Sequence, residues 1–308
     1  MLQKFCLAMV FVFVLGSLPC VAQEFVLYSF PPAAELNWKT PYTLAWGAGV
    51  KGRLSLQHGK AKHTIGHCFM ELIGADGTRD LTGMTTAPDA PPDVDFITKK
   101  GYGLGLLFAP MQGAFDPSQK LDAELKGRYE TGRVAFFRFR ISQAQYARMK
   151  QYLTEYKARG YDKIYNGLNE PRKGLGAGCS AFAMSFLDVT NLIDPVMNQQ
   201  WIRRVNIPLD LIGGPLTGKT VSLGKFTTSA RWAKPGEPAR ELALYDPQLI
   251  FEWLGKEAEK ARFDKLHGAT PETTLLGKPC RFVRRGNAVG LYLDVSDRPV
   301  PTDPLWKE

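Results

Sequence analysis

The residue best suited to covalent chemistry in this chain is Cys179. It lies in the run GLGAGCSAF, which spans residues 174–182 and leads into apolar residues at helical spacing. A thiol in the first turn of a helix lies near the positive end of the helix dipole and near unpaired backbone N–H groups. Both favour the thiolate, which is the reactive form of cysteine. The pattern therefore predicts a nucleophilic cysteine.

A cysteine nucleophile usually works with an imidazole and with a polar group that orients the ring. The chain has four histidines, of which His67 opens a strand pattern that continues to residue 73. A ring at the start of a strand is rigidly placed and still reachable, so we expect His67 to be the base. His63 is the main rival, and His58 and His267 are weaker candidates.

The orienting group is expected on the strand that follows His67. Residues 74–77 read GADG, a turn signal, and residues 78–83 read as the returning strand of a hairpin. With a four-residue turn, Asp80 and Thr82 lie on the same face as His67. We expect Asp80 to orient the ring because of its charge, with Thr82 as the alternative because it is nearer in register.

The first 22 residues have the pattern of a secretory signal. Lys4 precedes an apolar run over residues 5–18, and Ala22 offers a small residue for cleavage. We therefore expect export to the periplasm or secretion, with the protein peripheral to the envelope at most. Three cysteines remain after the signal, namely Cys68, Cys179 and Cys280. A disulfide through Cys179, a Cys68–Cys280 pair and three reduced thiols all stay open, and we favour a free Cys179.

Composition and motifs argue against several other functions. The formal net charge is +9, but the basic residues are scattered rather than gathered in a stripe with aromatics, so we expect no nucleic-acid partner. Residues 213–220 match the phosphate-binding P-loop pattern, yet a strand-like run follows them instead of a helix, so we expect no nucleotide. His58, His63 and His67 lack the companion ligands of a closed zinc site. We expect no metal and no cofactor.

The remaining patterns predict an α+β protein. We expect a single domain over residues 23–200, after the signal at 1–22, and a C-terminal extension at 201–308 to which the sequence assigns no role. The expected strands are 53–57, 67–73, 78–83, 101–108 and 133–141, and the expected helices are 143–158 (capped by Ser142), 179–189 and 247–263.

Three segments together resemble the circularly permuted NlpC-like, papain-like cysteine hydrolases, which include the relatives of lecithin retinol acyltransferase. They are IGHCFMELIGADGTRDL (65–81), ISQAQYARMKQYLTEYKARG (141–160) and YDKIYNGLNEPRKGLGAGCSAFAMSFL (161–187). In the permuted members the histidine hairpin precedes the cysteine helix, as it does here. The resemblance covers roughly residues 50–190.

The resemblance implies a papain-like core, an antiparallel sheet packed against helices, with Cys179 as nucleophile and His67 as base. It places the third polar residue on the next strand, at Asp80 or Thr82, and Tyr165 matches a tyrosine common before the cysteine. Two departures concern the oxyanion hole: glycine precedes Cys179 where relatives often have an acidic residue or asparagine, and residues 170–176 form an insertion.

The function predicted from these features is that of a thiol hydrolase or acyltransferase. Its substrate would be a cell-wall peptide (peptidoglycan), another peptide or an acyl lipid. The first alternative is a catalytically silent relative that binds wall peptides or a protein partner. The second is an unrelated secreted protein in which Cys179 forms a structural disulfide.

Overall fold

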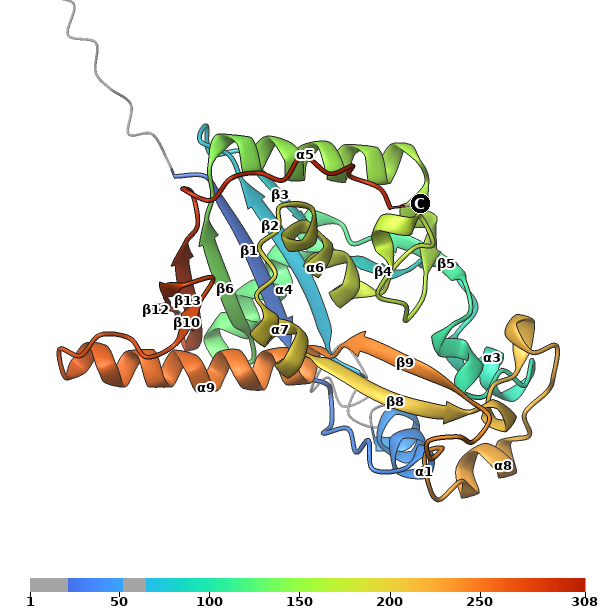
Figure 1. The fold of residues 1–308 in the computed structure, drawn as a ribbon. Helices are drawn as coiled ribbons and strands as arrows, with labels where there is room; N and C mark the ends of the chain where they lie inside the picture. The colour runs from blue at the N-terminus through green and yellow to red at the C-terminus, as the bar shows by residue number, and fades with distance from the viewer. Residues whose placement is uncertain (1–21, 52–64, 308) are drawn as a thin grey trace, which may run out of the picture.

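A six-stranded sheet lies at the centre of the molecule (Figure 1). The structure, a computed structural model, describes residues 22–51 and 65–307. The strand order is β12-β13-β6-β1-β2-β3, and all neighbours are antiparallel except the parallel pair β13–β6. The strands of this sheet are β1 (Glu24–Phe30), β2 (His67–Ile73), β3 (Arg79–Thr82), β6 (Ala135–Arg140), β12 (Arg281–Arg285) and β13 (Ala288–Asp294).

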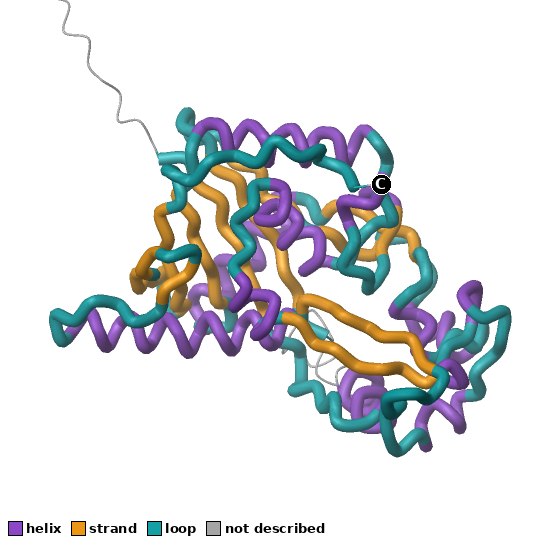
Figure 2. Tube along the Cα trace, viewed as in Figure 1, coloured by secondary structure: helices purple, strands orange, loops and turns teal. Residues whose placement is uncertain are grey.

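Helices cover both faces of the sheet (Figure 2). On one face, apolar residues of α4 (Ser118–Thr131) pack against Val26, Tyr28 and Phe30 of β1. On the other face, a larger core joins Phe25 and Leu27 of β1 to three helices. These are α5 (Gln143–Ala158), α6 (Cys179–Val189) and α9 (Pro247–Leu266). The alternation of side chains along a strand thus gives β1 two buried faces.

A smaller lobe packs beside the main sheet around its own apolar cluster. Its centre is the antiparallel hairpin of β8 (Ile202–Pro208) and β9 (Ala239–Tyr245), and short helices surround it (Figure 1). The helices are α1 (Pro41–Ala45), α3 (Asp93–Thr98) and α8 (Leu223–Thr228). The other elements are α7 (Pro195–Gln200) and the short strands β4 (Met84–Thr86), β5 (Met111–Phe115), β7 (Ile164–Tyr165), β10 (Thr274–Leu275) and β11 (Lys278–Pro279).

The expected α+β class is confirmed, and several elements form where the sequence predicts them. Helix α5 begins after Ser142, whose hydroxyl accepts from the backbone N–H of Gln145 while the Gln145 side chain accepts from the Ser142 N–H. The predicted strand at 101–108 is wrong, since the chain forms a 3₁₀ helix there (Leu104–Leu107). Strand β1 and helix α4 were not predicted, because β1 lies in an aromatic- and proline-rich segment after residue 22 and residues 118–131 have a weak helical pattern.

The segment after residue 200, to which the sequence assigned no role, contributes to both parts of the molecule. It supplies the β8–β9 hairpin to the smaller lobe, and then α9, β12 and β13 to the main body. The expected signal at residues 1–22 and the expected strand at 53–57 lie outside the described residues, apart from Ala22. Among the helices that the structure describes, none combines the length and apolar character needed to cross a bilayer.

Candidate functional site

Cys179 is the first residue of α6, as the glycine-rich run predicts. Gly178 precedes the helix in an extended conformation and offers no side chain to cap the first-turn N–H groups. These N–H groups therefore stay available for a developing negative charge near the sulfur. The Cys179 residue is buried, with 4% of its surface exposed.

His67 opens β2, and its ring is also buried, with 3% exposed. The ring nitrogen Nε2 lies 3.2 Å from Oδ2 of Asp116. This leaves Nδ1 as the nitrogen for the hydrogen bond between His67 and the Cys179 sulfur. Asp116 follows β5, and its own backbone N–H donates to the Gly83 carbonyl at 2.8 Å. The structure thus assembles Cys179, His67 and Asp116 from three separate elements.

The prediction that Asp80 or Thr82 shares a face with His67 is wrong. Residues 74–78 form a loop of five residues, so Ile73 pairs with Arg79 rather than with residue 78. This one-residue difference turns Asp80 and Thr82 to the face opposite His67. Asp80 instead accepts a hydrogen bond from Lys150 Nζ at 2.5 Å. The orienting carboxylate is Asp116, 49 positions from His67 in the chain.

The electrostatics of the site favour a thiolate–imidazolium pair. Burial by itself would raise the pKa of Cys179, but the charge of His67 and its hydrogen bond to the sulfur outweigh burial and lower it. Burial by itself would lower the pKa of His67, but the Cys179 charge and the Asp116 hydrogen bond raise it to about 9. The two shifts have opposite signs because each charged group stabilises the other.

Asp116 is held in its ionised form by the groups around it. Burial would raise its pKa, yet His67 and Lys120 lower it below the ordinary range. Lys120 Nζ lies 2.6 Å from Oδ1, one helical turn further along the chain. One carboxylate oxygen therefore contacts the imidazole and the other contacts the ammonium group, which fixes the plane of the carboxylate.

Two further groups contact the Cys179 sulfur. The side chain of Tyr165 in β7 hydrogen-bonds to it, and so does the backbone of Cys68. Both interactions lower the pKa of the thiol. Burial and the nearby Cys179 charge raise the pKa of Tyr165 well above its ordinary value, so its hydroxyl stays protonated and acts as a donor. The resemblance singled out Tyr165, and the structure places it at the sulfur.

The loop before Cys179 is packed too closely for larger residues. A Cβ atom on Gly178 would lie 2.8 Å from the Asn166 carbonyl oxygen. The Asn166 side chain holds the same loop, since Nδ2 donates to the Leu175 carbonyl at 2.6 Å. Close packing therefore explains why glycine precedes Cys179.

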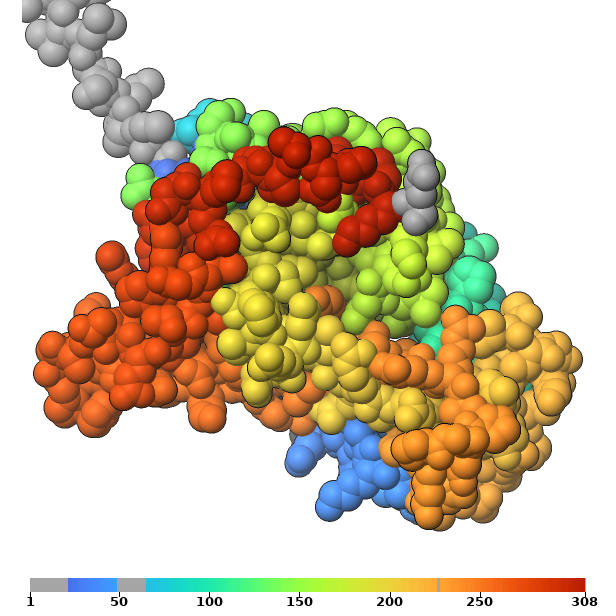
Figure 3. Space-filling model, viewed as in Figure 1, coloured from blue at the N-terminus to red at the C-terminus, as the bar shows by residue number. Residues whose placement is uncertain are grey.

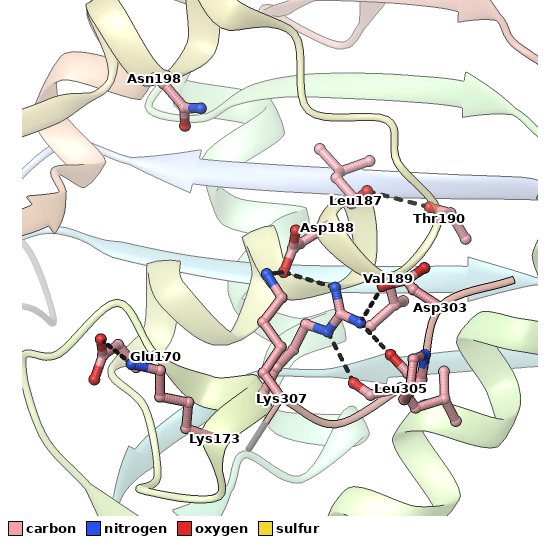
Figure 4. Close-up of polar contacts among 12 residues, drawn as sticks. Glu170, Lys173, Leu187, Asp188, Val189, Thr190, Asn198, Asp303, Leu305 and Lys307 are labelled. Atoms are coloured by element: carbon pink, nitrogen blue, oxygen red, sulfur yellow. Dashed lines mark hydrogen bonds and ion pairs between the residues drawn. The ribbon is translucent and has the colours of Figure 1, made fainter. Parts of the chain in front are cut away.

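The loop at 170–176 is anchored by Arg172, whose residue surface is 3% exposed. Its guanidinium donates to the Leu305 carbonyl at 2.8 Å, to Asp303 at 2.8 Å and to Asp188 at 3.1 Å. Lys307 reaches the same Asp188 carboxylate at 3.0 Å (Figure 4). The C-terminal segment thus ties the loop before Cys179 to the last turns of α6.

A polar groove of about 290 Å³ lies beside this anchor. Ala181, Ser185 and Asp188 line it from α6, and Tyr245 lines it from β9. Figure 3 shows the C-terminal segment, in red, on the surface of the molecule. At 100° per residue these α6 positions face away from Cys179. The groove therefore lies on the side of α6 opposite Cys179, and it does not include Cys179, His67 or Asp116.

The other candidate residues do not join the site in the part of the chain that the structure describes. Cys68, Cys179 and Cys280 are all free thiols. His267 lies at the end of α9, and its Nδ1 is 2.8 Å from the Phe263 carbonyl oxygen. His58 and His63 fall outside the described residues. Within the described ranges, no group of His, Cys, Asp and Glu side chains has the arrangement of a metal site.

The P-loop-like run at 213–220 lacks the preceding strand and the directly following helix that a phosphate-binding loop requires. A 3₁₀ helix (Leu209–Leu211) comes before it and another (Gly214–Leu216) lies within it, so no buried strand leads into the run. The next helix, α8, begins only at Leu223. These residues form a turn of the smaller lobe, closed by a hydrogen bond from the Gly214 N–H to the Lys219 carbonyl.

Comparison of the chain with protein-family models, with curated proteins and with solved structures finds no match.

Proposed function

We propose that the protein is a thiol hydrolase or acyltransferase of papain-like type that acts on an amide or ester. The observation that carries this proposal is the buried series Cys179–His67–Asp116 at the start of a helix. A carboxylate that orients an imidazole, which in turn activates a thiol, is the arrangement of cysteine hydrolases. The resemblance to permuted NlpC-like hydrolases points the same way.

The chemistry follows from the protonation states of the pair. The Cys179 thiolate attacks the substrate carbonyl carbon, and the oxyanion that forms accepts hydrogen bonds from first-turn N–H groups of α6. The carbon–nitrogen or carbon–oxygen bond then breaks while the His67 imidazolium donates its Nδ1 proton to the leaving group. A water molecule, or an acceptor amine or alcohol, gives a proton to His67 and attacks the thioester. This step releases the acyl group and restores the thiolate.

The position of the nucleophile suits a substrate that enters between the two parts of the molecule. The Ser180 hydroxyl, next to Cys179, donates to the carbonyl of Tyr245 at the end of β9 at 2.5 Å. The Ser29 hydroxyl donates to the Pro247 carbonyl at the start of α9 at 2.7 Å. The sulfur is thus close to where the main sheet meets the hairpin lobe, and such junctions commonly hold ligand sites. Exported peptides, peptidoglycan peptides and acyl lipids are the substrate classes we propose.

The small exposed fraction of Cys179 favours a second candidate function. A silent papain-like protein would keep the same fold and use the junction between its parts to bind wall peptides or a protein partner. An enzyme must let the substrate carbonyl reach a sulfur that has only 4% of its residue surface exposed. The two candidates therefore differ in the reactivity of the thiol.

The pH dependence of Cys179 alkylation by iodoacetamide tests the proposal. We expect the wild type to react with an apparent pKa below the ordinary value of about 8.5. His67→Ala should raise that pKa and slow the reaction at neutral pH. His267→Ala is the matched control, because His267 lies at the exposed end of α9. A thiol that is unreactive, or that ignores the loss of His67, would refute the paired nucleophile and favour the binding function.

A further inference from the structure

A second thiol lies beside the Cys179 sulfur, and the proposed mechanism gives it no role. Cys68 follows His67 in β2, and none of its surface is exposed. Its side chain lies on the face of the sheet that α6 covers, in the core that also contains Phe182 and Phe186 (Figure 1). The backbone of Cys68 hydrogen-bonds to the Cys179 sulfur. Two free thiols are thus held together at the start of α6.

The hydrogen bond between the Cys68 backbone and the Cys179 sulfur limits the distance between the two sulfur atoms. Such a bond joins atoms about 3.5 Å apart, because sulfur is larger than oxygen. Three covalent bonds separate the Cys68 nitrogen from its own sulfur and span about 3–4 Å, depending on the rotamer. The sulfurs are therefore at most about 7 Å apart, and the two α carbons at most about 8 Å apart. Rotation about the Cα–Cβ bond of Cys179, together with a small approach of the α carbons to the roughly 4.4–6.8 Å of a disulfide, can join the sulfurs.

The two thiols differ in the way that a nucleophile and a resolving thiol require. His67 lowers the pKa of Cys179, so its sulfur is the thiolate that reacts with peroxide. Burial and the Cys179 charge raise the pKa of Cys68 well above its ordinary value, so Cys68 keeps its proton while Cys179 is a thiolate. The Cys68 thiol accordingly donates to the Ser29 hydroxyl at 3.4 Å. Oxidation of Cys179 removes its negative charge, and with it one of the effects that hold the proton on Cys68.

The third thiol, Cys280, shows that burial alone does not create such a pair. It is as buried as Cys68, and burial raises the pKa of its thiol to about 12. Its thiol is influenced by the carboxylates of Asp194 and Glu257 rather than by Cys179. Cys280 is therefore a matched control for Cys68.

We propose that Cys68 is a resolving thiol, which forms a reversible disulfide with Cys179 after peroxide oxidises the nucleophile. The inference rests on the activated Cys179 of the proposed function and adds a form of regulation to the same site. While the disulfide is present, the Cys179 sulfur cannot attack a carbonyl carbon, and a dithiol that reduces the bond restores it. The disulfide also prevents further oxidation of Cys179 to sulfinic acid, which a dithiol does not reverse.

The first step is attack of the Cys179 thiolate on hydrogen peroxide. A sulfur–oxygen bond forms and the oxygen–oxygen bond breaks, so the sulfur is oxidised to sulfenic acid and the peroxide is reduced. The departing hydroxide takes the imidazolium proton of His67 and becomes water. In the second step the Cys68 sulfur attacks the Cys179 sulfur and the sulfur–oxygen bond breaks. The leaving hydroxide takes the Cys68 thiol proton, so one peroxide gives one disulfide and two waters.

The burial of Cys179 suits a small oxidant. Only 4% of its residue surface is exposed. Hydrogen peroxide is little larger than water, so it needs a narrower approach to the sulfur than a peptide or an ester does.

Peroxide treatment of the full chain, followed by mass spectrometry, tests the inference. We expect the wild type to give a linked pair of peptides, joined from Cys68 to Cys179 and lighter by two hydrogen atoms than the two thiol peptides. Dithiothreitol should then restore nearly all of the iodoacetamide labelling of Cys179. In Cys68→Ser the same treatment should give sulfinic acid at Cys179, and dithiothreitol should restore almost none of the labelling. Untreated Cys68→Ser should still label at Cys179, which shows that the variant folds, and Cys68→Ala should repeat the result.

Cys280→Ser is the control, and it should form the Cys68–Cys179 disulfide like the wild type. A disulfide from Cys179 to Cys280, sulfinic acid at Cys179 of the wild type without a disulfide, or equal recovery in Cys68→Ser and Cys280→Ser would overturn the inference. The two proposals fail separately. A wild-type Cys179 that alkylates with a lowered pKa but forms no disulfide would overturn this inference alone. A Cys68–Cys179 disulfide in a protein whose alkylation ignores His67→Ala would instead refute the paired nucleophile.

Discussion

The role of Asp116 can be measured through the reactivity of a different residue, Cys179. Asp116 accepts the hydrogen bond from His67 at 3.2 Å and stabilises the imidazolium form. Asp116→Asn removes the negative charge and keeps the shape of the side chain. We expect the His67 pKa to fall from about 9 and the Cys179 pKa to rise, because the thiolate depends on the imidazolium charge.

The size of the shift follows from the strength of the lost interaction. A hydrogen bond to a charged group contributes about 1.5–3 kcal/mol, and about 1.4 kcal/mol corresponds to one pKa unit. Full loss would therefore shift the His67 pKa by about 1–2 units. The amide of asparagine keeps a neutral hydrogen bond, so we expect about one unit, and the thiolate of Cys179 should lose a similar amount of stabilisation.

The assay is alkylation of Cys179 by iodoacetamide across the pH range, with mass spectrometry to confirm the labelled residue. Asp80→Asn is the matched control, because it removes the same charge from a residue that pairs with Lys150 on the opposite face of the hairpin. The wild type and Asp80→Asn should have the same apparent pKa. An unchanged profile in Asp116→Asn, or an equal shift in both variants, would refute the assignment of Asp116 as the orienting residue.

Two further substitutions test how the thiolate is held. Tyr165→Phe removes the side-chain hydrogen bond to the Cys179 sulfur, so the apparent pKa of Cys179 should rise by about half a unit to one unit with little change in thermal stability. An unchanged alkylation profile would contradict this contact. Gly178→Ala should lower both stability and Cys179 reactivity, since its Cβ would meet the Asn166 carbonyl oxygen at 2.8 Å. The control is Gly127→Ala in α4, where the added Cβ would have no atom within 4 Å. This variant should instead raise the free energy of urea unfolding by about 1 kcal/mol. A Gly178→Ala protein as stable and reactive as the wild type would refute the packing argument.

Local features of the sequence were enough to single out Cys179 and His67, the proposed nucleophile and base. Helix α6 begins at Cys179 because a glycine precedes a run of apolar residues at helical spacing, and both signals lie within a few positions of each other. Strand β2 spans the seven strand-forming residues from His67 to Ile73, and the turn signal at 74–77 marks its end. Such patterns depend on residues close together in the chain, so they can be interpreted without knowledge of the rest of the fold.

The third residue of the site, Asp116, could not be predicted from local sequence patterns. Asp116 lies between β5, whose sequence has a weak strand pattern, and α4. An aspartate followed by a proline at this place is typical of the start of a helix, so nothing in the local sequence indicates a partner for His67. It reaches His67 only because β4 and β5 pair and its backbone N–H donates to Gly83. One extra residue in the loop at 74–78 also moved Asp80 to the other face. A shift of one residue in a turn moves every later side chain of the strand to the other face of the sheet. Sequence patterns do not locate turns to within one residue, so they could not decide the face of Asp80.

The chemical types at the site were therefore set by the sequence, and their partners were set by the tertiary structure. A thiol at a helix start and an imidazole at a strand start follow from residue order over short distances. The choice of carboxylate, the reduced state of all three described cysteines and the joining of residues after 200 to the main sheet rest on contacts between distant segments. Such contacts form only when burial of apolar faces brings those segments together, and no local pattern contains that information.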